Sequence, residues 1–314
     1  MSRPLRILYA GAFYHVTARG NEKKSIFKND RDYEKFLSYI EAAVERYGAV
    51  INAYYLMSNH YHLLVQTPRA NLPEVMKYIN GSYTSYINTK RQSVGHLFQG
   101  RYKAILIDAD SYAQELSRYI HLNPVRAEIV SKPEEYRWSS YQCYTGKEKS
   151  PKWLTMQFIL DCFDEQTSIG QRKYREFVED KIGQRYDDPI KDAVASSILG
   201  GEEFIQRIKR KYLQGRDADR NVPGLTELRK RSVPEIMKVI QKEMKGDERL
   251  QKGAGIYLWH RYSGLRLKEI GEYFGISESG VTQASKRFGM RLEKDGKLNR
   301  KIKSLCIKLD LSNV

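Results

Sequence analysis

The sequence predicts an α+β fold, in which a ferredoxin-like βαββαβ domain with one added helix is followed by an all-α region ending in a helix-turn-helix. Two observations predict this fold. Short β-favouring runs alternate with amphipathic helical patterns as far as Ile107, and the pattern becomes helical throughout after about Trp153. Polar stretches interrupt the pattern twice, so we expect three parts, at residues 1–146, 147–222 and 223–314.

Local signals set the elements of the first part. Gly48 supplies a helix stop, Ser58–Asn59 fits a tight hairpin turn, and Asn71 fits a helix cap. A capping box at Ser111 would begin a further helix, which Pro124 would end. The expected elements are, in order, strand 12–19, helix 30–47, strands 50–57 and 60–66, a helix from Asn71, strand 102–107 and a helix from Ser111 to Pro124.

Two histidines one residue apart are the most informative local feature. His60 and His62 lie on an apolar strand, so both side chains point to one face, and convergent neutral imidazoles often bind a metal. On the later helix, Tyr119 and Asn123 are four residues apart and share a face. The pattern predicts Mg²⁺ or Mn²⁺ held by His60, His62 and the amide oxygen of Asn123, beside the Tyr119 hydroxyl. Two ordinary hydrogen-bonded histidines are the alternative, and we expect a structural or DNA-contacting role for His15.

The charge of the chain points to an anionic partner. Its 314 residues include 54 Lys and Arg against 38 Asp and Glu, a net charge of +16, which is typical of proteins that bind nucleic acid. The three cysteines are widely spaced, so a zinc ribbon and a disulfide framework are both disfavoured and a reducing cytoplasm fits. There is no signal-peptide pattern and no run of 18 apolar residues, so we expect no membrane partner.

The last part carries a more specific pattern at residues 267–287. Gly275 would supply a sharp turn, Ser277 would cap the following helix, and Gly271 is small where two helices would cross. This spacing is typical of a helix-turn-helix that binds duplex DNA, although a helical bundle with chance glycine spacing is the alternative. The side chains expected to face the groove or its phosphates are Ser279, Thr282, Gln283, Lys286 and Arg287.

Two further expectations concern the rest of the chain. Between Lys286 and Lys308, nine basic residues stand against two acidic ones, which favours phosphate binding. Residues 147–222 are expected to form a helical middle region whose small core contains Leu160, Phe163, Tyr174, Phe177, Ile198, Phe204 and Ile208.

Several sequence blocks, in one order, carry a family resemblance. They are Tyr14-His-Val-Thr-Ala-Arg-Gly-Asn21, Met57-Ser-Asn-His-Tyr-His-Leu-Leu64, Gly95-His-Leu-Phe-Gln-Gly-Arg101, Tyr119-Ile-His-Leu-Asn-Pro-Val-Arg126 and Tyr136-Arg-Trp-Ser-Ser-Tyr141. They resemble the HUH endonuclease superfamily, most closely the REP-associated tyrosine transposases and their single-tyrosine insertion-sequence relatives. The resemblance spans roughly Tyr9 to Thr145. It departs from the family at Tyr61, where an aliphatic residue is usual.

The resemblance implies a metal-dependent endonuclease and strand transferase that cleaves single-stranded DNA, often beside a hairpin. It places the metal ligands on His60, His62 and Asn123 and the nucleophile on Tyr119, which would form a 5′-phosphotyrosine and free a 3′ hydroxyl. Insertion-sequence relatives are dimers that exchange the tyrosine helix, whereas REP-associated ones can act alone, so a monomer and a homodimer both stay open. Further phosphate contacts are expected from Arg101, Lys103, Arg118 and Arg126.

The C-terminal segment separately resembles the duplex-binding domain of the replication initiator DnaA, which implies a second, double-stranded DNA partner. Two other functions are weighed against a transposase-like enzyme. A non-catalytic DNA-binding regulator built on the same fold would form no covalent adduct with DNA. A metal-dependent hydrolase of small molecules is disfavoured by the positive charge and by the lack of further ligand clusters.

Overall fold

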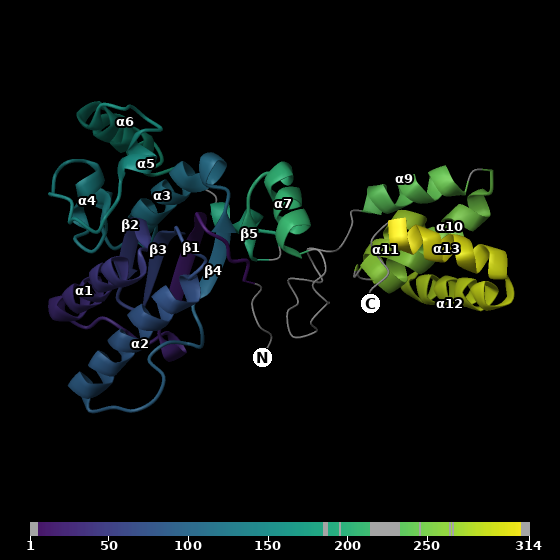
Figure 1. The fold of residues 1–314 in the computed structure, drawn as a ribbon, viewed down its shortest axis with the longest axis horizontal. Helices are drawn as coiled ribbons and strands as arrows, with labels where there is room; N and C mark the ends of the chain where they lie inside the picture. The colour runs from purple at the N-terminus through teal and green to yellow at the C-terminus, as the bar shows by residue number, and fades with distance from the viewer. Residues whose placement is uncertain are drawn as a thin grey trace. The chain divides into compact units, whose positions relative to one another are not determined.

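The computed structural model describes residues 6–184, 188–194, 196–213, 233–244, 246–263, 265 and 267–308. The chain divides into two compact units (Figure 1). The larger unit spans Arg6–Tyr212, so most of the expected middle region at 147–222 is part of it. The expected boundary between residues 222 and 223 lies outside the described residues.

A mixed sheet of five strands forms the centre of the larger unit, in the order β2-β3-β1-β4-β5. The strands are β1 (Ala12–Arg19), β2 (Val50–Met57), β3 (His60–Thr67), β4 (Lys103–Ile107) and β5 (Ile198–Leu199). The first four pair antiparallel, and helices α1 (Asp30–Tyr47) and α2 (Leu72–Arg91) complete the βαββαβ order. The expected α+β fold with this topology is confirmed.

The fifth strand is a correction to the expected helical core. Ile198 was expected on a helix, but it pairs with Leu106 in a parallel bridge that extends the sheet beyond β4. Both residues are buried, so the pairing removes apolar side chains from water as well as satisfying backbone groups. A two-residue strand is too short to produce a readable alternation in the sequence.

The two faces of the sheet are covered by different helices (Figure 1). Helices α1 and α2 pack together on one face, where Tyr61 is fully buried and its ring lies 4.8 Å from that of Phe36. The Tyr61 hydroxyl donates to Asn80 Oδ1 on α2, so the departure from an aliphatic residue is accommodated by a paired polar group. Helix α3 (Ala109–Arg126) covers the other face.

Both expected ends of α3 are wrong. The helix begins at Ala109, and the preceding Asp108 makes no side-chain capping hydrogen bond. Ser111 lies inside the helix, where its hydroxyl donates to Asp108 Oδ2. Pro124 does not end the helix, which continues to Arg126. A proline in the last turn removes only one backbone donor, and the Ala127 amide still donates to the carbonyl of Asn123.

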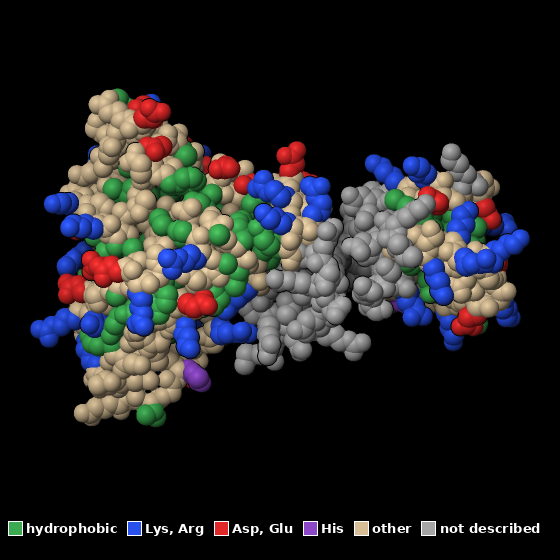
Figure 2. All heavy atoms as spheres, viewed as in Figure 1, with side chains coloured by type: hydrophobic (Ala, Val, Ile, Leu, Met, Phe, Trp, Pro, Cys, Tyr) green, Lys and Arg blue, Asp and Glu red, His purple; other side chains and the backbone are tan. Residues whose placement is uncertain are grey.

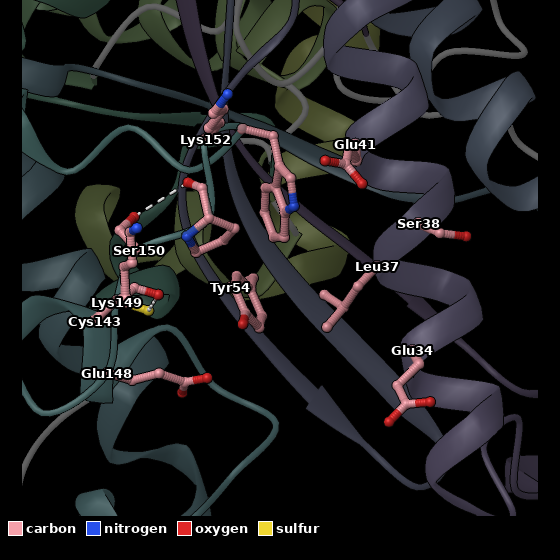
Figure 3. A pocket seen from close by; sticks show the side chains of 12 residues that line it. Glu34, Leu37, Ser38, Glu41, Tyr54, Cys143, Glu148, Lys149, Ser150 and Lys152 are labelled. Atoms are coloured by element: carbon pink, nitrogen blue, oxygen red, sulfur yellow. Dashed lines mark hydrogen bonds between the residues drawn. The ribbon is translucent and has the colours of Figure 1, made fainter.

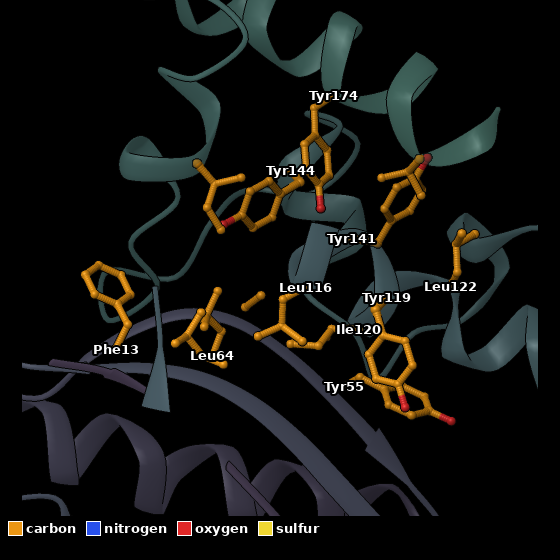
Figure 4. Close-up of a cluster of buried hydrophobic side chains, with 14 of the residues drawn as sticks. Phe13, Tyr55, Leu64, Leu116, Tyr119, Ile120, Leu122, Tyr141, Tyr144 and Tyr174 are labelled. Atoms are coloured by element: carbon orange, nitrogen blue, oxygen red, sulfur yellow. The ribbon is translucent and has the colours of Figure 1, made fainter. Parts of the chain in front are cut away.

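The helices after α3 complete the same core. Helices α4 (Tyr141–Tyr144), α5 (Gln157–Leu160), α6 (Thr167–Glu179) and α7 (Glu202–Ile208) follow one another in the chain. Leu160 and Tyr174, expected in a separate helical core, are buried in one cluster with Leu116, Ile120 and strand residues (Figure 4). Residues 147–212 belong to the larger unit because their apolar side chains share its hydrophobic core.

The secondary structure described in the second unit is all helical, as expected. It contains α9 (Val233–Glu243), α10 (Glu248–Leu258), α11 (Leu267–Phe274), α12 (Glu278–Lys294) and α13 (Gly296–Lys308). Its core includes Ile240, Trp259, Ile270 and Val281. Across the part of the chain that the structure describes, every helix is too short or too polar to cross a bilayer.

Candidate functional site

The paired histidines lie on the face of β3 that α3 covers. In the strand register, His62 stands opposite Thr17 of β1 and Tyr55 of β2, and His60 stands opposite Arg19. The ring centroids of His60 and His62 are 5.2 Å apart. His62 is buried, whereas His60 is half-buried near the end of its strand. One edge of a two-histidine site is therefore open to a ligand.

The phenol of Tyr119 lies over the same face, in the same chain. Its ring centroid is 6.0 Å from that of His62, and the ring is nearly buried, at 7% exposure. The hydroxyl donates a 3.4 Å hydrogen bond to Asp188 Oδ2. Burial raises the pKa of Tyr119, the Asp188 carboxylate raises it further, and the Arg126 guanidinium, 5.0 Å from the ring centroid, opposes the rise. The phenol is consequently protonated at neutral pH.

The ring nitrogens of the two histidines are already oriented. His60 Nδ1 lies 2.6 Å from Asn59 Oδ1, and Asn59 Nδ2 donates to the Lys23 carbonyl, which fixes the direction of that amide. His60 Nδ1 is therefore the protonated nitrogen, and Nε2 keeps its lone pair. His62 Nδ1 lies 2.8 Å from His15 Nε2. Burial lowers the pKa of His60 to about 4 and that of His62 well below its ordinary value, so both rings are neutral at pH 7.

His60, His62 and Asn123 carry donor atoms that could bind a divalent ion. Neutral imidazoles with a free Nε2 are metal ligands, and the Asn123 amide next to Tyr119 adds an oxygen donor. Asn123 Nδ2 donates to the Tyr119 carbonyl along α3, which leaves its Oδ1 as the available ligand atom. Among the described residues, no group of three His, Cys, Asp or Glu side chains could hold an ion, so substrate or water oxygens would have to complete the coordination.

Basic side chains border the same face. Lys103 of β4 stands opposite Thr17, in the same row across the sheet as His62, and is exposed. Arg19 is exposed beside His60, whose pKa it helps to lower. Arg101 is exposed just before β4, and Arg126 lies over the Tyr119 ring. These side chains could contact the phosphates of a strand crossing the site.

Arg118 does not belong to this set, which corrects the expectation from the sequence. Its side chain is buried, paired with Glu115, and its Nη1 donates to the carbonyl of Phe177. The guanidinium also stacks on the Phe177 ring, 3.9 Å from the centroid. Arg118 lies on the face of α3 that packs on α6. Its contacts therefore hold the two helices together, and its side chain does not face the site.

Three residues near the site were missed by sequence reasoning. Arg19 could have been found, because strand alternation places it on the same face as His15. Tyr55 is fully buried, with its ring 6.0 Å from that of His62 and its hydroxyl unpartnered among the described residues (Figure 4). Asp188 lies 69 positions from Tyr119, and no local signal joins them.

A hollow elsewhere on this unit has different chemistry (Figure 3). It lies between α1 and the segment 148–153, and Tyr54 forms part of its wall. Since Tyr54 and Tyr55 are adjacent on β2, they point to opposite faces of the sheet, so this hollow is remote from the histidine pair. Its charged lining residues are three glutamates and two lysines: Glu34, Glu41, Glu148, Lys149 and Lys152.

Residues 9–123 match the family model of IS200-like transposases. The match covers less than half of the chain and includes His60, His62, Tyr119 and Asn123. It supports assigning the N-terminal part of the larger unit to a transposase-type domain. A search of curated proteins found no match.

Two solved structures are similar to the chain. One is a REP-associated tyrosine transposase bound to a REP hairpin, at 17% identity over 49% of this chain and 92% of that one, with a TM-score of 0.42. The other is a putative transposase from Deinococcus radiodurans R1, at 16% identity over 38% of this chain and 95% of that one, with a TM-score of 0.28.

The second unit contains two helices around a tight turn. Gly275 has φ +65°, and the Ser277 hydroxyl accepts from the Gly280 amide at the start of α12. A Cβ on Gly271 would come within 2.5 Å of the Ile276 carbonyl oxygen, so glycine is required by the turn backbone and not by a crossing helix. The five side chains expected to face DNA are all exposed: Ser279, Thr282, Gln283, Lys286 and Arg287.

Proposed function

We propose that this chain is a metal-dependent HUH-type tyrosine endonuclease and strand transferase that acts on single-stranded DNA, at hairpin-associated sites. One observation carries the proposal: the phenol of Tyr119 and the rings of His60 and His62 converge on one face of the sheet within one chain. The family match over residues 9–123 supports a transposase-like activity. The positive net charge suits a polyanionic substrate.

Each group has a distinct role in the proposed reaction. Mg²⁺ or Mn²⁺, held by His60, His62 and Asn123, would neutralise charge on a non-bridging oxygen of the scissile phosphate. The Tyr119 oxygen attacks phosphorus in line, and Asp188, its hydrogen-bond acceptor, takes the phenolic proton. The bond from phosphorus to the 3′ oxygen breaks, so the 5′ side remains as a phosphotyrosine, and the leaving 3′ oxygen takes a proton from water to become a hydroxyl. Because one ester replaces another, a 3′ hydroxyl can reverse the step without ATP.

The basic residues around the site would guide the strand. Arg19, Lys103 and Arg126, which border the histidine pair and Tyr119, would contact phosphates of the bound strand, and Arg101 would extend this set. The Tyr119 ring lies 6.0 Å from the His62 ring of the same chain, which favours attack by the tyrosine of the same protomer. The cytoplasm is the expected compartment for such an activity.

The second unit is proposed to bind duplex DNA. Helix α12 presents Thr282 and Gln283 to solvent on the same side as Lys286 and Arg287, and the following helix α13 adds further exposed basic residues. Figure 2 shows many Lys and Arg side chains on the visible face of this unit. In this arrangement the polar side chains would contact base edges and the cationic side chains would contact phosphates.

A non-catalytic DNA-binding regulator is the second candidate, because the Tyr119 phenol is nearly buried and held by Asp188. One experiment separates the two functions. Labelled single-stranded hairpin DNA is incubated with the full chain and Mn²⁺, and the products are run on a denaturing gel. An adduct whose modified peptide maps to Tyr119 is expected from the enzyme. Salt-sensitive binding without any adduct would support the regulator and overturn the proposed chemistry.

A further inference from the structure

His15 occupies an unusual position for a polar residue. It lies in the middle of β1, with Leu64 and Ile105 as its cross-strand neighbours, and only 1% of its surface is exposed. Phe13 is the preceding residue on the same face. An aliphatic side chain would fill this slot and bury more apolar area, so packing alone gives no reason for a histidine there.

Among the described residues, the His15 ring forms a hydrogen bond with His62 alone. His15 Nε2 and His62 Nδ1 are 2.8 Å apart, and the two ring planes are inclined by only 27°. The other ring nitrogen of His15, Nδ1, is buried without a partner. A buried polar atom without a partner destabilises the fold, so its presence calls for an explanation such as a functional role.

The hydrogen bond between His15 and His62 corresponds to the one between Asn59 and His60. His60 is held at Nδ1 by Asn59, and His62 is held at Nδ1 by His15. In each case the remaining nitrogen, Nε2, is the one left for a ligand. For His62 to present a lone pair at Nε2, its proton must be on Nδ1, and His15 Nε2 must then be the acceptor. His15 and Asn59 thus act on different histidines in the same way.

We propose that His15 is a positioning residue that orients His62 and holds it in the tautomer able to bind a divalent ion. The inference rests on the proposed metal site but concerns a residue outside the ligand set. His15 itself donates no ligand atom: its Nε2 faces His62, and its Nδ1 is enclosed in the apolar slot of β1. Its effect on the ion passes entirely through the ring of His62.

The test uses two substitutions of His15 in the full chain. His15→Phe keeps the ring volume and removes the acceptor, so the affinity for Mn²⁺, measured by isothermal titration calorimetry without DNA, should fall about 10–100-fold. His15→Gln supplies an amide oxygen near the former Nε2 and should recover most of that loss. Histidine ¹⁵N spectra of the Mg²⁺-loaded protein should show His62 protonated at Nδ1 in the wild type, and this signature should be lost in His15→Phe.

A matched control separates positioning from stability. His121 is also fully buried and hydrogen-bonded, but its partners are Ser140 and Tyr174, away from the site. His121→Phe should therefore lower the unfolding temperature while keeping wild-type Mn²⁺ affinity. Equal Mn²⁺ affinity in His15→Phe and the wild type, with normal His62 spectra, would overturn the inference and leave the proposed function intact. A wild-type chain that binds neither Mn²⁺ nor Mg²⁺ would remove the metal site and this inference together.

Discussion

The Tyr119 hydroxyl donates a hydrogen bond to Asp188 Oδ2, and this contact joins helix α3 to a segment beyond the region that matches the transposase family. The other carboxylate oxygen of Asp188 accepts from the Ile190 amide, so the side chain is fixed from two directions. The carboxylate raises the pKa of the phenol and at the same time supplies a proton acceptor. The segment at residue 188 therefore influences the proposed nucleophile directly.

Removing that carboxylate should slow the chemistry. In Asp188→Asn the phenol keeps a hydrogen-bond partner but loses its proton acceptor, so the rate of adduct formation should fall about 10²-fold or more. Single-turnover assays with excess protein would measure the rate. Asp192→Asn is the matched control, since Asp192 is exposed in the same short helix. An unchanged or faster rate in Asp188→Asn would show that Asp188 is not the base.

Tyr119→Phe should bind DNA like the wild type and form no adduct. The substitution removes one hydroxyl, whose hydrogen bond to Asp188 is long at 3.4 Å, so the free energy of unfolding should change by about 1 kcal/mol or less. Tyr112→Phe, two turns earlier on α3, is the control and should keep full adduct yield. Adduct at wild-type level from Tyr119→Phe would exclude Tyr119 as the nucleophile.

His60→Ala should lose both Mn²⁺ binding and metal-supported cleavage. The substitution removes one of two imidazole ligands, and no described acidic side chain is placed to replace it. Calorimetry and the adduct assay measure the two effects separately. His96→Ala is the control because His96 is exposed on the loop before β4. Cleavage that persists at the wild-type rate in His60→Ala would remove His60 from the site.

His121 should make the larger unit sensitive to acid. Burial lowers its pKa to about 3 in the folded chain, whereas the unfolded chain has the ordinary value of about 6.5. Below pH 6.5 the unfolded state gains a proton that the folded state does not, so stability is complete above pH 6.5 and declines as the pH falls. The contribution lost between pH 6.5 and 5 is about 2 kcal/mol. The free energy of unfolding, measured by denaturant titration, should fall between pH 7 and pH 5 by about 2 kcal/mol less in His121→Gln than in the wild type. In the control His96→Gln, where the substituted residue is exposed, the fall should equal that of the wild type.

The second unit should bind duplex DNA in a salt-dependent manner. Lys286→Ala and Arg287→Ala should each weaken binding for all sequences and reduce the slope of log affinity against log salt by about 1. Gln283→Ala should leave that slope unchanged and alter only sequence preference. Fluorescence anisotropy over a range of NaCl measures these effects, with Lys268→Ala on α11 as the control. Equal salt slopes in all variants would exclude α12 from the interface.

Local chemistry predicted most of the larger unit correctly. Strand 12–19 and helix 30–47 were expected at the residues where they occur, because their signals are local: a short β-favouring run for β1, and apolar residues at helical spacing with a Gly48 stop for α1. The pairing of His60 and His62 on one face needed only the two-residue period of a strand. Both ends of α3 were predicted wrongly. The helix begins at Ala109, before Ser111, and it continues past Pro124 because a proline in the last turn removes only one backbone donor.

By itself, the sequence determined the order of elements, the shared face of the histidines and the exposed polar row of α12, since each depends on neighbours within a few residues. Only the tertiary structure decided that Arg118 packs on α6, that Asp188 reaches Tyr119 and that His15 holds His62. These contacts join residues 47 to 69 positions apart. Their geometry depends on how whole helices pack on the sheet, which no local periodicity records.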